Sequence, residues 1–292
     1  MISGLQELVA PFSEREFSEI LRTRTLTLRR SSGENRFKGL LDWETYRSAV
    51  ESGTVPIGKY RVTKKTRHVP PIFYTKNGKI DKSKFANLID HGASLVSSRL
   101  DRYMPALGAL CGDIRAHVAE YATAGAVMTT GSGGALRLHY DNDDIIVLQL
   151  EGSKRWMIYG QPVANPLHGM PEQPKPQSSP IFDEVLRPGD FLFLPAGYWH
   201  HCENGPELSL HVVILFRPPS GLHAVHALMP QLLAEEIFRV PLTRFSGETE
   251  KAAHEAALKA RLIEKITQFS MLELPLDAMP RQTHGRIDEP DY

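Results

Sequence analysis

Two apolar stretches near the middle of the chain carry its clearest pattern, and turns enclose both of them. Residues 144–150 are a run of Ile, Val and Leu that predicts a buried strand, and residues 191–194 predict a second, shorter one. Glu151-Gly152-Ser153 predicts a tight turn, from which residues 154–159 return as the other strand of a hairpin. Short strands punctuated by Gly and Pro are typical of a β barrel or sandwich.

Helical periodicity lies on both sides of this β-rich centre. Ser13 and Glu16 form a capping-box pattern at the start of the first predicted helix. Helices are predicted at 14–21, 40–50, 82–92, 104–121, 228–237 and 248–269, and further short strands at 26–28, 93–100 and 124–130. The change of periodicity after the prolines at 218–219 predicts a β domain over 1–220 and a helical extension over 221–292.

The composition changes this picture little. The chain has 292 residues, of which 41% are hydrophobic, so a large core is expected. Lys and Arg total 34, as do Asp and Glu, so no net charge recruits nucleic acid or an anionic membrane. No apolar run has the length of a membrane span, and the first residues lack a secretion-signal pattern. With only Cys111 and Cys202 present, we expect a reduced, cytoplasmic protein.

Two segments invite more than one interpretation. Five basic residues gather before the centre of the chain, at Lys59, Arg61, Lys64, Lys65 and Arg67. A solvated strand face is the simpler interpretation, and a docking patch for an acidic or nucleic-acid-rich partner is the alternative. Residues 161–180 are rich in proline and predict a long loop, and long loops beside a site are often functional.

A candidate metal site begins at the mouth of the strand 144–150. His139 and Asp141 are two residues apart, and in an extended chain such side chains point to the same face. After the strand 191–194 and a turn come His200 and His201, of which only one can point inward. Two His and one carboxylate leave three positions of an octahedral ion open, which is the arrangement of non-haem Fe(II) oxygenases.

The two stretches together resemble a known family. HYDNDDIIVLQLEGSKRW followed by RPGDFLFLPAGYWHH is similar to the JmjC-type, cupin-fold 2-oxoglutarate oxygenases, and most to the ribosomal-oxygenase branch, which hydroxylates side chains of proteins. The match covers residues 125–218. It implies a mainly β fold with flanking helices, a double-stranded β-helix (cupin or jelly-roll) core and a C-terminal helical extension that forms a homodimer. It also implies that His139, Asp141 and His200 hold the iron.

The same resemblance assigns the cosubstrate pocket. A basic residue at the position of Lys154 pairs with the far carboxylate of 2-oxoglutarate in related oxygenases. Charge counting agrees, because Fe(II), one Asp and the dianion sum to one negative charge, which a buried Lys neutralises. Arg155 lies on the opposite strand face and is not expected to serve. His211, in the next strand, is either a core histidine or a contact to the cosubstrate.

One departure from the branch lies on the strand before the glycine-rich loop. The branch carries an Asn and a Tyr there, and this sequence aligns Ala124 and Ala126 with them. We therefore expect Thr129, Thr130 or Ser132 to supply a hydroxyl to the cosubstrate, or the pocket to be rebuilt.

These features predict a 2-oxoglutarate-dependent dioxygenase, an oxidoreductase that uses Fe(II), 2-oxoglutarate and O2 and releases succinate and CO2. The expected substrate is an amino-acid side chain in a ribosomal protein or a ribosomally made peptide, with a free amino acid as a third option. Nucleic acid is expected only indirectly, through a ribosomal substrate. The alternative is a metal-binding cupin without 2-oxoglutarate, namely a small-ligand binding module, an isomerase or another dioxygenase. Lys154 separates the two, because such cupins lack a matching lysine.

Overall fold

The structure is a computed structural model, and it describes residues 13–32, 35–118, 121–132, 135–160, 164–167, 170–171, 174–217, 220–241 and 247–270. The chain divides into two compact units, residues 1–217 and 218–292. The elements of the first unit are, in order, α2 (Glu14–Thr23), β1 (Thr27–Arg29), α3 (Trp43–Ser52), β2 (Tyr60–Lys64), β3 (Arg67–Val69), η1 (Pro71–Phe73), β4 (Thr75–Lys76), β5 (Lys79–Ile80), α4 (Lys82–Asp90), β6 (Ala93–Ser97), η2 (Leu100–Arg102), α5 (Pro105–His117), β7 (Tyr121–Thr129), β8 (Asp144–Glu151), β9 (Lys154–Ile158), β10 (Phe182–Leu186), β11 (Phe191–Leu194), β12 (His200–Asn204) and β13 (Ser209–Arg217).

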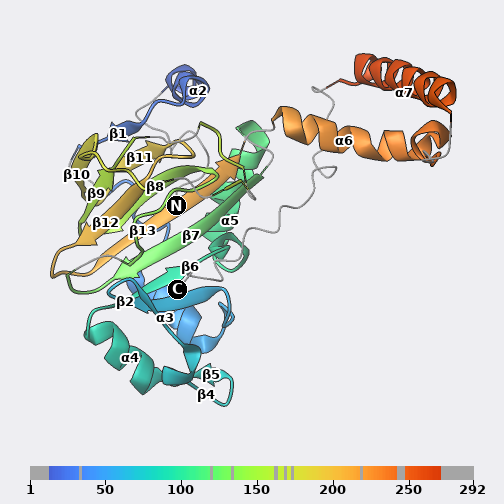
Figure 1. The fold of residues 1–292 in the computed structure, drawn as a ribbon. Coiled ribbons are helices and arrows are strands. Elements are labelled where there is room, and N and C mark those ends of the chain that lie inside the picture. The colour runs from blue at the N-terminus through green and yellow to red at the C-terminus, as the bar shows by residue number, and fades with distance from the viewer. Residues whose placement is uncertain are drawn as a thin grey trace. The chain divides into compact units, whose positions relative to one another are not determined.

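Two antiparallel sheets form the core of this unit (Figure 1). The large sheet has the strand order β1-β11-β8-β13-β7-β6-β2-β3, and the small sheet has the order β10-β9-β12. Ile145 and Val147 of β8 share one hydrophobic cluster with Trp156 and Ile158 of β9, so the two sheets pack face to face. This arrangement is the predicted double-stranded β-helix, and the prediction of the fold is confirmed.

The other face of the large sheet is covered by helices. Ile146 and Leu148 of β8 belong to a second hydrophobic cluster, together with Tyr46 of α3, Phe85 of α4 and Leu107 of α5. Strand β8 therefore buries both of its faces, since neighbouring residues point to opposite sides. Burial on both sides explains why the sequence shows an unbroken apolar run here instead of an alternation.

The predicted elements match the structure closely, apart from their ends. Ser13 accepts a hydrogen bond from the backbone N–H of Glu16 (3.2 Å), and the Glu16 carboxylate accepts one from the Ser13 N–H (2.8 Å), which confirms the capping box. Helix α5 is shorter than predicted, because β7 already begins at Tyr121. Strand β10 falls just after the predicted 161–180 loop and had no clear pattern, since its burial alternates weakly.

Gly152 has the most demanding position in the β8–β9 turn. Its φ is +58°, and a Cβ atom there would lie 1.8 Å from the carbonyl oxygen of Leu208. Gly152→Ala must therefore move a backbone segment as well as adopt a strained conformation. We expect it to lower the free energy of unfolding by roughly 2–5 kcal/mol, measured by urea denaturation.

The matched control for this substitution is Gly205→Ala. No atom lies within 4 Å of a Cβ built at Gly205, and its φ is not positive. This control should change the free energy of unfolding by no more than about 0.5 kcal/mol. An equal change in the free energy of unfolding for the two substitutions would contradict the close approach of Gly152 to the Leu208 carbonyl.

The second unit is helical. It contains α6 (Gly221–Ala234), η3 (Glu236–Phe238) and α7 (Glu248–Gln268). Glu235 joins the two helices, because its carboxylate lies 2.7 Å from both Arg261 and Lys265. Exposed apolar residues follow one stripe of α6 at helical spacing: Leu222, Val225, Met229 and Leu233. No helix in the described ranges is both long and apolar enough to cross a membrane.

Candidate metal centre and cosubstrate pocket

Three predicted ligands meet at one end of the barrel. One donor atom from each of His139, Asp141 and His200 lies within 4.8 Å of the other two. The His200 Nε2 atom is 3.6 Å from Asp141 Oδ2, and the centroids of the two imidazole rings are 4.4 Å apart. His200 is buried, whereas His139 and Asp141 are half-buried, so one side of the cluster is open to solvent.

Backbone hydrogen bonds bring the two histidines together. The N–H of His139 donates to the carbonyl of His200 (3.1 Å), and the N–H of His200 donates to the carbonyl of His139 (2.7 Å). The carbonyl of Asp141 also accepts a bond from Gly197 N–H, at 2.9 Å. The segments that carry the two motifs are therefore locked in register before any ligand binds.

The imidazoles are oriented as metal ligands require. Nδ1 of His139 lies 2.8 Å from the carbonyl oxygen of Arg137, and Nδ1 of His200 lies 3.0 Å from that of Tyr198. Because a carbonyl oxygen can only accept, each Nδ1 carries the proton and each Nε2 presents a lone pair. Burial lowers the pKa of His200 to about 3, with His139 adding to the effect, so this ring is neutral at pH 7.

A salt bridge that sequence reasoning missed fixes the mouth of the site. Arg24, just after α2, contacts the Asp144 carboxylate at 2.5 and 3.1 Å, and the same carboxylate accepts from Ala196 N–H at 2.8 Å. Asp144 thus ties the start of β8 to the turn before His200. The acidic residues between 141 and 144 indicated that a basic partner was needed, but that partner, Arg24, lies far away in the sequence.

Lys154 enters the same barrel from β9. Its side chain is 1% exposed, and the ammonium donates one hydrogen bond, to the Thr129 hydroxyl at 2.7 Å. Burial lowers the pKa of Lys154 to about 8. Arg155 points the other way and pairs with Asp183 on the outer face at 2.7 Å, as expected from alternation along the strand.

The strand β7 offers Thr129 to this pocket, not the two alanines. Ala124 and Ala126 belong to the cluster under the helices, on the face of β7 that looks away from Lys154. The alignment of these alanines with pocket residues was therefore wrong about the face. Thr129 is buried beside Lys154, Thr130 bonds instead to the carbonyls of Ile89 and Ala93, and Ser132 is exposed.

Trp156 contacts the rings of both His200 and His211. The Trp156 indole stacks on the His200 ring, with centroids 5.6 Å apart and planes at 23°, and meets His211 edge-on at 5.5 Å. His211 is 3% exposed, and burial, followed by Lys154 and His200, lowers its pKa well below the usual range. Within the described part of the chain, its Nδ1 atom and the Trp156 Nε1 atom are buried without a hydrogen-bond partner.

These donor atoms fit a divalent metal and a dicarboxylic acid. Two imidazole Nε2 atoms and one carboxylate suit a first-row ion, and the open side leaves room for further ligands. Among the described residues, the buried Lys154 ammonium has one hydrogen-bond partner, a neutral hydroxyl, which leaves its positive charge uncompensated there. A carboxylate would neutralise that charge. The unpaired ring nitrogens of His211 and Trp156 are further polar groups awaiting a partner.

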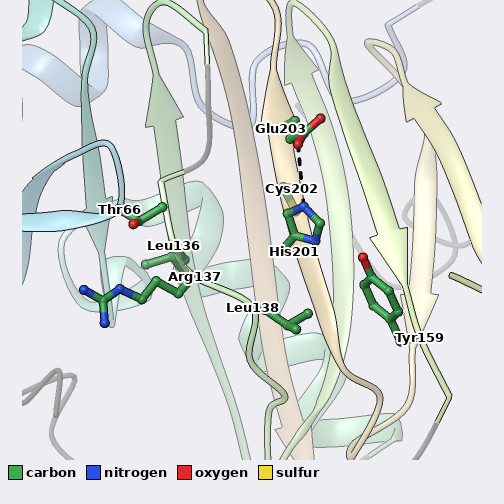
Figure 2. Close-up of a pocket in the computed structure, with 8 residues that line it drawn as sticks. All are labelled: Thr66, Leu136, Arg137, Leu138, Tyr159, His201, Cys202 and Glu203. Atoms are coloured by element: carbon green, nitrogen blue, oxygen red, sulfur yellow. Dashed lines mark ion pairs between the residues drawn. The ribbon is translucent and has the colours of Figure 1, made fainter. Parts of the chain in front are cut away.

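His201 lies outside this cluster. Its ring stacks on Tyr159 with centroids 6.1 Å apart, and its Nε2 atom is 3.7 Å from Glu203. It helps to line an open pocket of about 370 Å³ beside β12 (Figure 2). The full lining is Thr66, Leu136, Arg137, Leu138, Tyr159, His201, Cys202 and Glu203.

Comparison with known proteins agrees with this fold and site. Residues 111–223 match the model of the JmjC domain. The fold is similar to that of a solved structure of E. coli ycfD, with a TM-score of 0.59, 18% identity, and coverage of 85% of this chain and 67% of the other. A structure of YcfD, described as a ribosomal oxygenase from Escherichia coli in complex with cobalt and 2-oxoglutarate, gives a TM-score of 0.57 at 17% identity, over 86% of this chain and 67% of that chain.

Curated relatives carry related names. A bifunctional lysine-specific demethylase and histidyl-hydroxylase NO66 from Drosophila grimshawi is 31% identical over 46% of this chain and 20% of its own length. Ribosomal oxygenase 2 from Rattus norvegicus is 36% identical over 30% of this chain and 19% of its own length. In eight such relatives, the chain spans between 17% and 35% of the relative's own length. The resemblance predicted from the two motifs is confirmed.

Proposed function

We propose that this protein is an Fe(II)- and 2-oxoglutarate-dependent hydroxylase that acts on an amino-acid side chain in a protein or peptide. The observation that carries the proposal is Lys154, a buried ammonium in the same barrel as a cluster of two His and one Asp. Supporting it, relatives are named histidyl-hydroxylase and ribosomal oxygenase, and YcfD has a structure with cobalt and 2-oxoglutarate.

The residues divide the work between them. His139, Asp141 and His200 would hold the metal, and Lys154, with Thr129 beside it, would hold the far carboxylate of 2-oxoglutarate. His211 Nδ1 would contact the cosubstrate, since it is buried without a partner among the described residues, whereas Ser132, being exposed, is the weaker of the predicted contacts. When bound, iron and 2-oxoglutarate supply the oxidation, in which O2 converts 2-oxoglutarate to succinate and CO2 and hydroxylates the substrate.

The direct test is an anaerobic titration of 2-oxoglutarate into the Fe(II)-loaded protein. Chelation of iron by the keto acid should produce a weak visible charge-transfer band that saturates with one cosubstrate per protein. Iron binding without any band would contradict the proposal and favour a cupin that works without 2-oxoglutarate. Because relatives are named histidyl-hydroxylases, histidine-containing peptides are the first substrates to test, by mass spectrometry.

The pKa of Lys154 predicts how cosubstrate affinity depends on pH. Without cosubstrate, Lys154 loses its proton as pH rises through about 8, whereas 2-oxoglutarate stays a dianion. Affinity should therefore be constant at low pH and fall above pH 8, approaching about tenfold per pH unit. Calorimetric titration of the Mn(II)-loaded protein measures this, and Lys154→Arg is the control, since arginine keeps its charge and should remove the dependence.

The same shift has a consequence for stability. The pKa of Lys154 is lower in the folded protein than in the unfolded chain, so the folded state binds fewer protons between about pH 8 and the usual lysine range. Stability therefore rises with pH through that window, opposite in direction to cosubstrate affinity.

We also propose that residues 221–292 mediate a homodimer and that the protein works in the cytoplasm. The exposed stripe of Leu222, Val225, Met229 and Leu233 on α6 supports self-association, because such a stripe otherwise contacts water. A monomer by light scattering at micromolar concentration would remove the dimer from this proposal.

A further inference from the structure

The pocket of Figure 2 lies against an unpaired strand edge. Strand β12 is the last strand of the small sheet, and among the described residues the backbone of its outer edge is hydrogen-bonded only at the bridge between His139 and His200. At the far end of the strand, the Asn204 side chain donates to the carbonyls of Thr129 and Gly131. Beyond that bridge, residues 136–138 form the opposite wall, and Thr66 at the tip of the β2–β3 hairpin lies at the side. An open strand edge is a ready-made partner for another extended chain.

The pocket lies close to the candidate metal centre along the chain. Leu138 precedes His139, and His201 follows His200, so two lining residues are one Cα step of about 3.8 Å from two ligands. A peptide that lies along this edge of β12 would therefore pass close to the cluster. At about 3.3 Å per residue, a side chain in the pocket belongs to a residue about two or three positions from the one oxidised.

The rim of the pocket carries uncompensated positive charge. Lys64, Lys65 and Arg67 surround Thr66 in the hairpin, all three are exposed, and so is Arg137. In the described part of the chain no ion pair reaches any of these four side chains. The one acidic residue of the lining, Glu203, already contacts Arg155 at 3.4 Å and His201 at 3.7 Å. The local potential therefore favours a negatively charged partner, although the whole chain is neutral.

The interior of the pocket is mostly apolar. Leu136 and Leu138 are half-buried in its wall, and Tyr159 faces them with its ring stacked on His201. One face of the tyrosine is thus already covered, which leaves little aromatic surface on which a nucleotide base can stack. An aliphatic side chain between acidic neighbours matches both the lining and the rim.

We propose that this pocket and the basic hairpin dock an acidic segment of the protein substrate, in extended form along β12, with an apolar side chain in the pocket. The proposal rests on the hydroxylase assignment, because the docked segment is a substrate only if the protein is a hydroxylase. It gives the basic cluster at 59–67 a role, because the hairpin that carries most of the cluster borders the pocket.

The test is fluorescence anisotropy with labelled peptides on the Fe(II)- and 2-oxoglutarate-loaded protein under anaerobic conditions. The probe has a central histidine, a leucine about three positions away, and glutamates around the leucine; the comparison peptide has glutamines instead. We expect the acidic peptide to bind roughly tenfold more tightly at low salt, and the difference to shrink at high salt.

Two variants form a matched pair. Lys64 and Arg67 face each other across the β2–β3 hairpin, and Lys76 and Lys79 face each other across the β4–β5 hairpin, with all four exposed. Lys64→Glu with Arg67→Glu should remove the preference for the acidic peptide. Lys76→Glu with Lys79→Glu makes the same charge change away from the pocket and should keep it.

Three results would overturn the proposal. The two peptides bind equally, or the preference survives in the Lys64→Glu/Arg67→Glu protein, or a single-stranded RNA oligonucleotide binds more tightly than the acidic peptide and is lost in that variant. The failure of the hydroxylase assignment looks different. In that case the charge-transfer band is missing from the unmodified protein, whereas acidic peptides are still preferred.

Discussion

Asp141→Ala is expected to abolish 2-oxoglutarate turnover, with activity reduced at least about a thousandfold, and to leave the protein unable to retain Fe(II) through gel filtration. Asp141 supplies the only carboxylate of the three-residue cluster, so its loss removes both a ligand and the negative charge that balances the ion. The visible band of the iron–cosubstrate chelate should disappear with the metal.

This substitution should not unfold the protein. Burial raises the pKa of the Asp141 carboxyl, with His139 opposing, which means that the charged side chain is held at a cost to stability. The melting temperature of the metal-free variant should therefore equal or exceed that of the metal-free parent. Asp183→Ala is the matched control, because Asp183 pairs with Arg155 on the outer face and lies away from the cluster. Retention of iron and turnover by Asp141→Ala would contradict the assigned ligand set.

Lys154→Met is expected to weaken 2-oxoglutarate binding by about a hundredfold to a thousandfold while leaving Fe(II) bound. Methionine keeps the length of the buried stem and removes the charge, so the far carboxylate of the cosubstrate would be buried without its partner, at a cost of about 3–5 kcal/mol. Calorimetric titration of the Mn(II)-loaded variant gives the affinity directly.

The control for Lys154→Met is Arg155→Met, one residue further along β9 and on the opposite face. Arg155 is half-exposed and paired with Asp183 and Glu203, so its loss should leave cosubstrate affinity unchanged. The Lys154 variant should also be more stable than the parent in the absence of ligand, because an uncompensated buried charge has been removed. Unchanged affinity in Lys154→Met would place the cosubstrate carboxylate elsewhere.

The sequence predicted those parts of the site that depend on neighbours along the chain. His139 and Asp141 share a face because alternation in an extended segment requires it, and Lys154 and Arg155 diverge for the same reason. The turn–strand–turn unit before His200 is also local, and the resemblance placed its ligand. Such features depend only on the two-residue alternation of side chains along an extended chain, which can be counted in the sequence.

Other parts depend on contacts between distant segments, and these were missed or misjudged. The Arg24–Asp144 pair joins residues that are 120 positions apart, and no periodicity links them. Ala124 and Ala126 were matched to pocket positions, but the pairing of β7 with its neighbours turns them towards the helices. Likewise, the open edge of β12 is a property of sheet order and could not be read from its five residues.

The backbone bridge between His139 and His200 has a consequence for metal selection. Because the segments that carry His139 and His200 are already hydrogen-bonded, little conformational entropy would be lost when an ion binds. The site therefore cannot select between ions through the cost of ordering these segments. Imidazole and carboxylate donors follow the general order of divalent affinities, in which Cu²⁺, Ni²⁺ and Zn²⁺ all bind more strongly than Fe²⁺. At the proposed iron site, occupancy would therefore be decided by supply, and trace zinc or nickel would compete with iron for the same three residues.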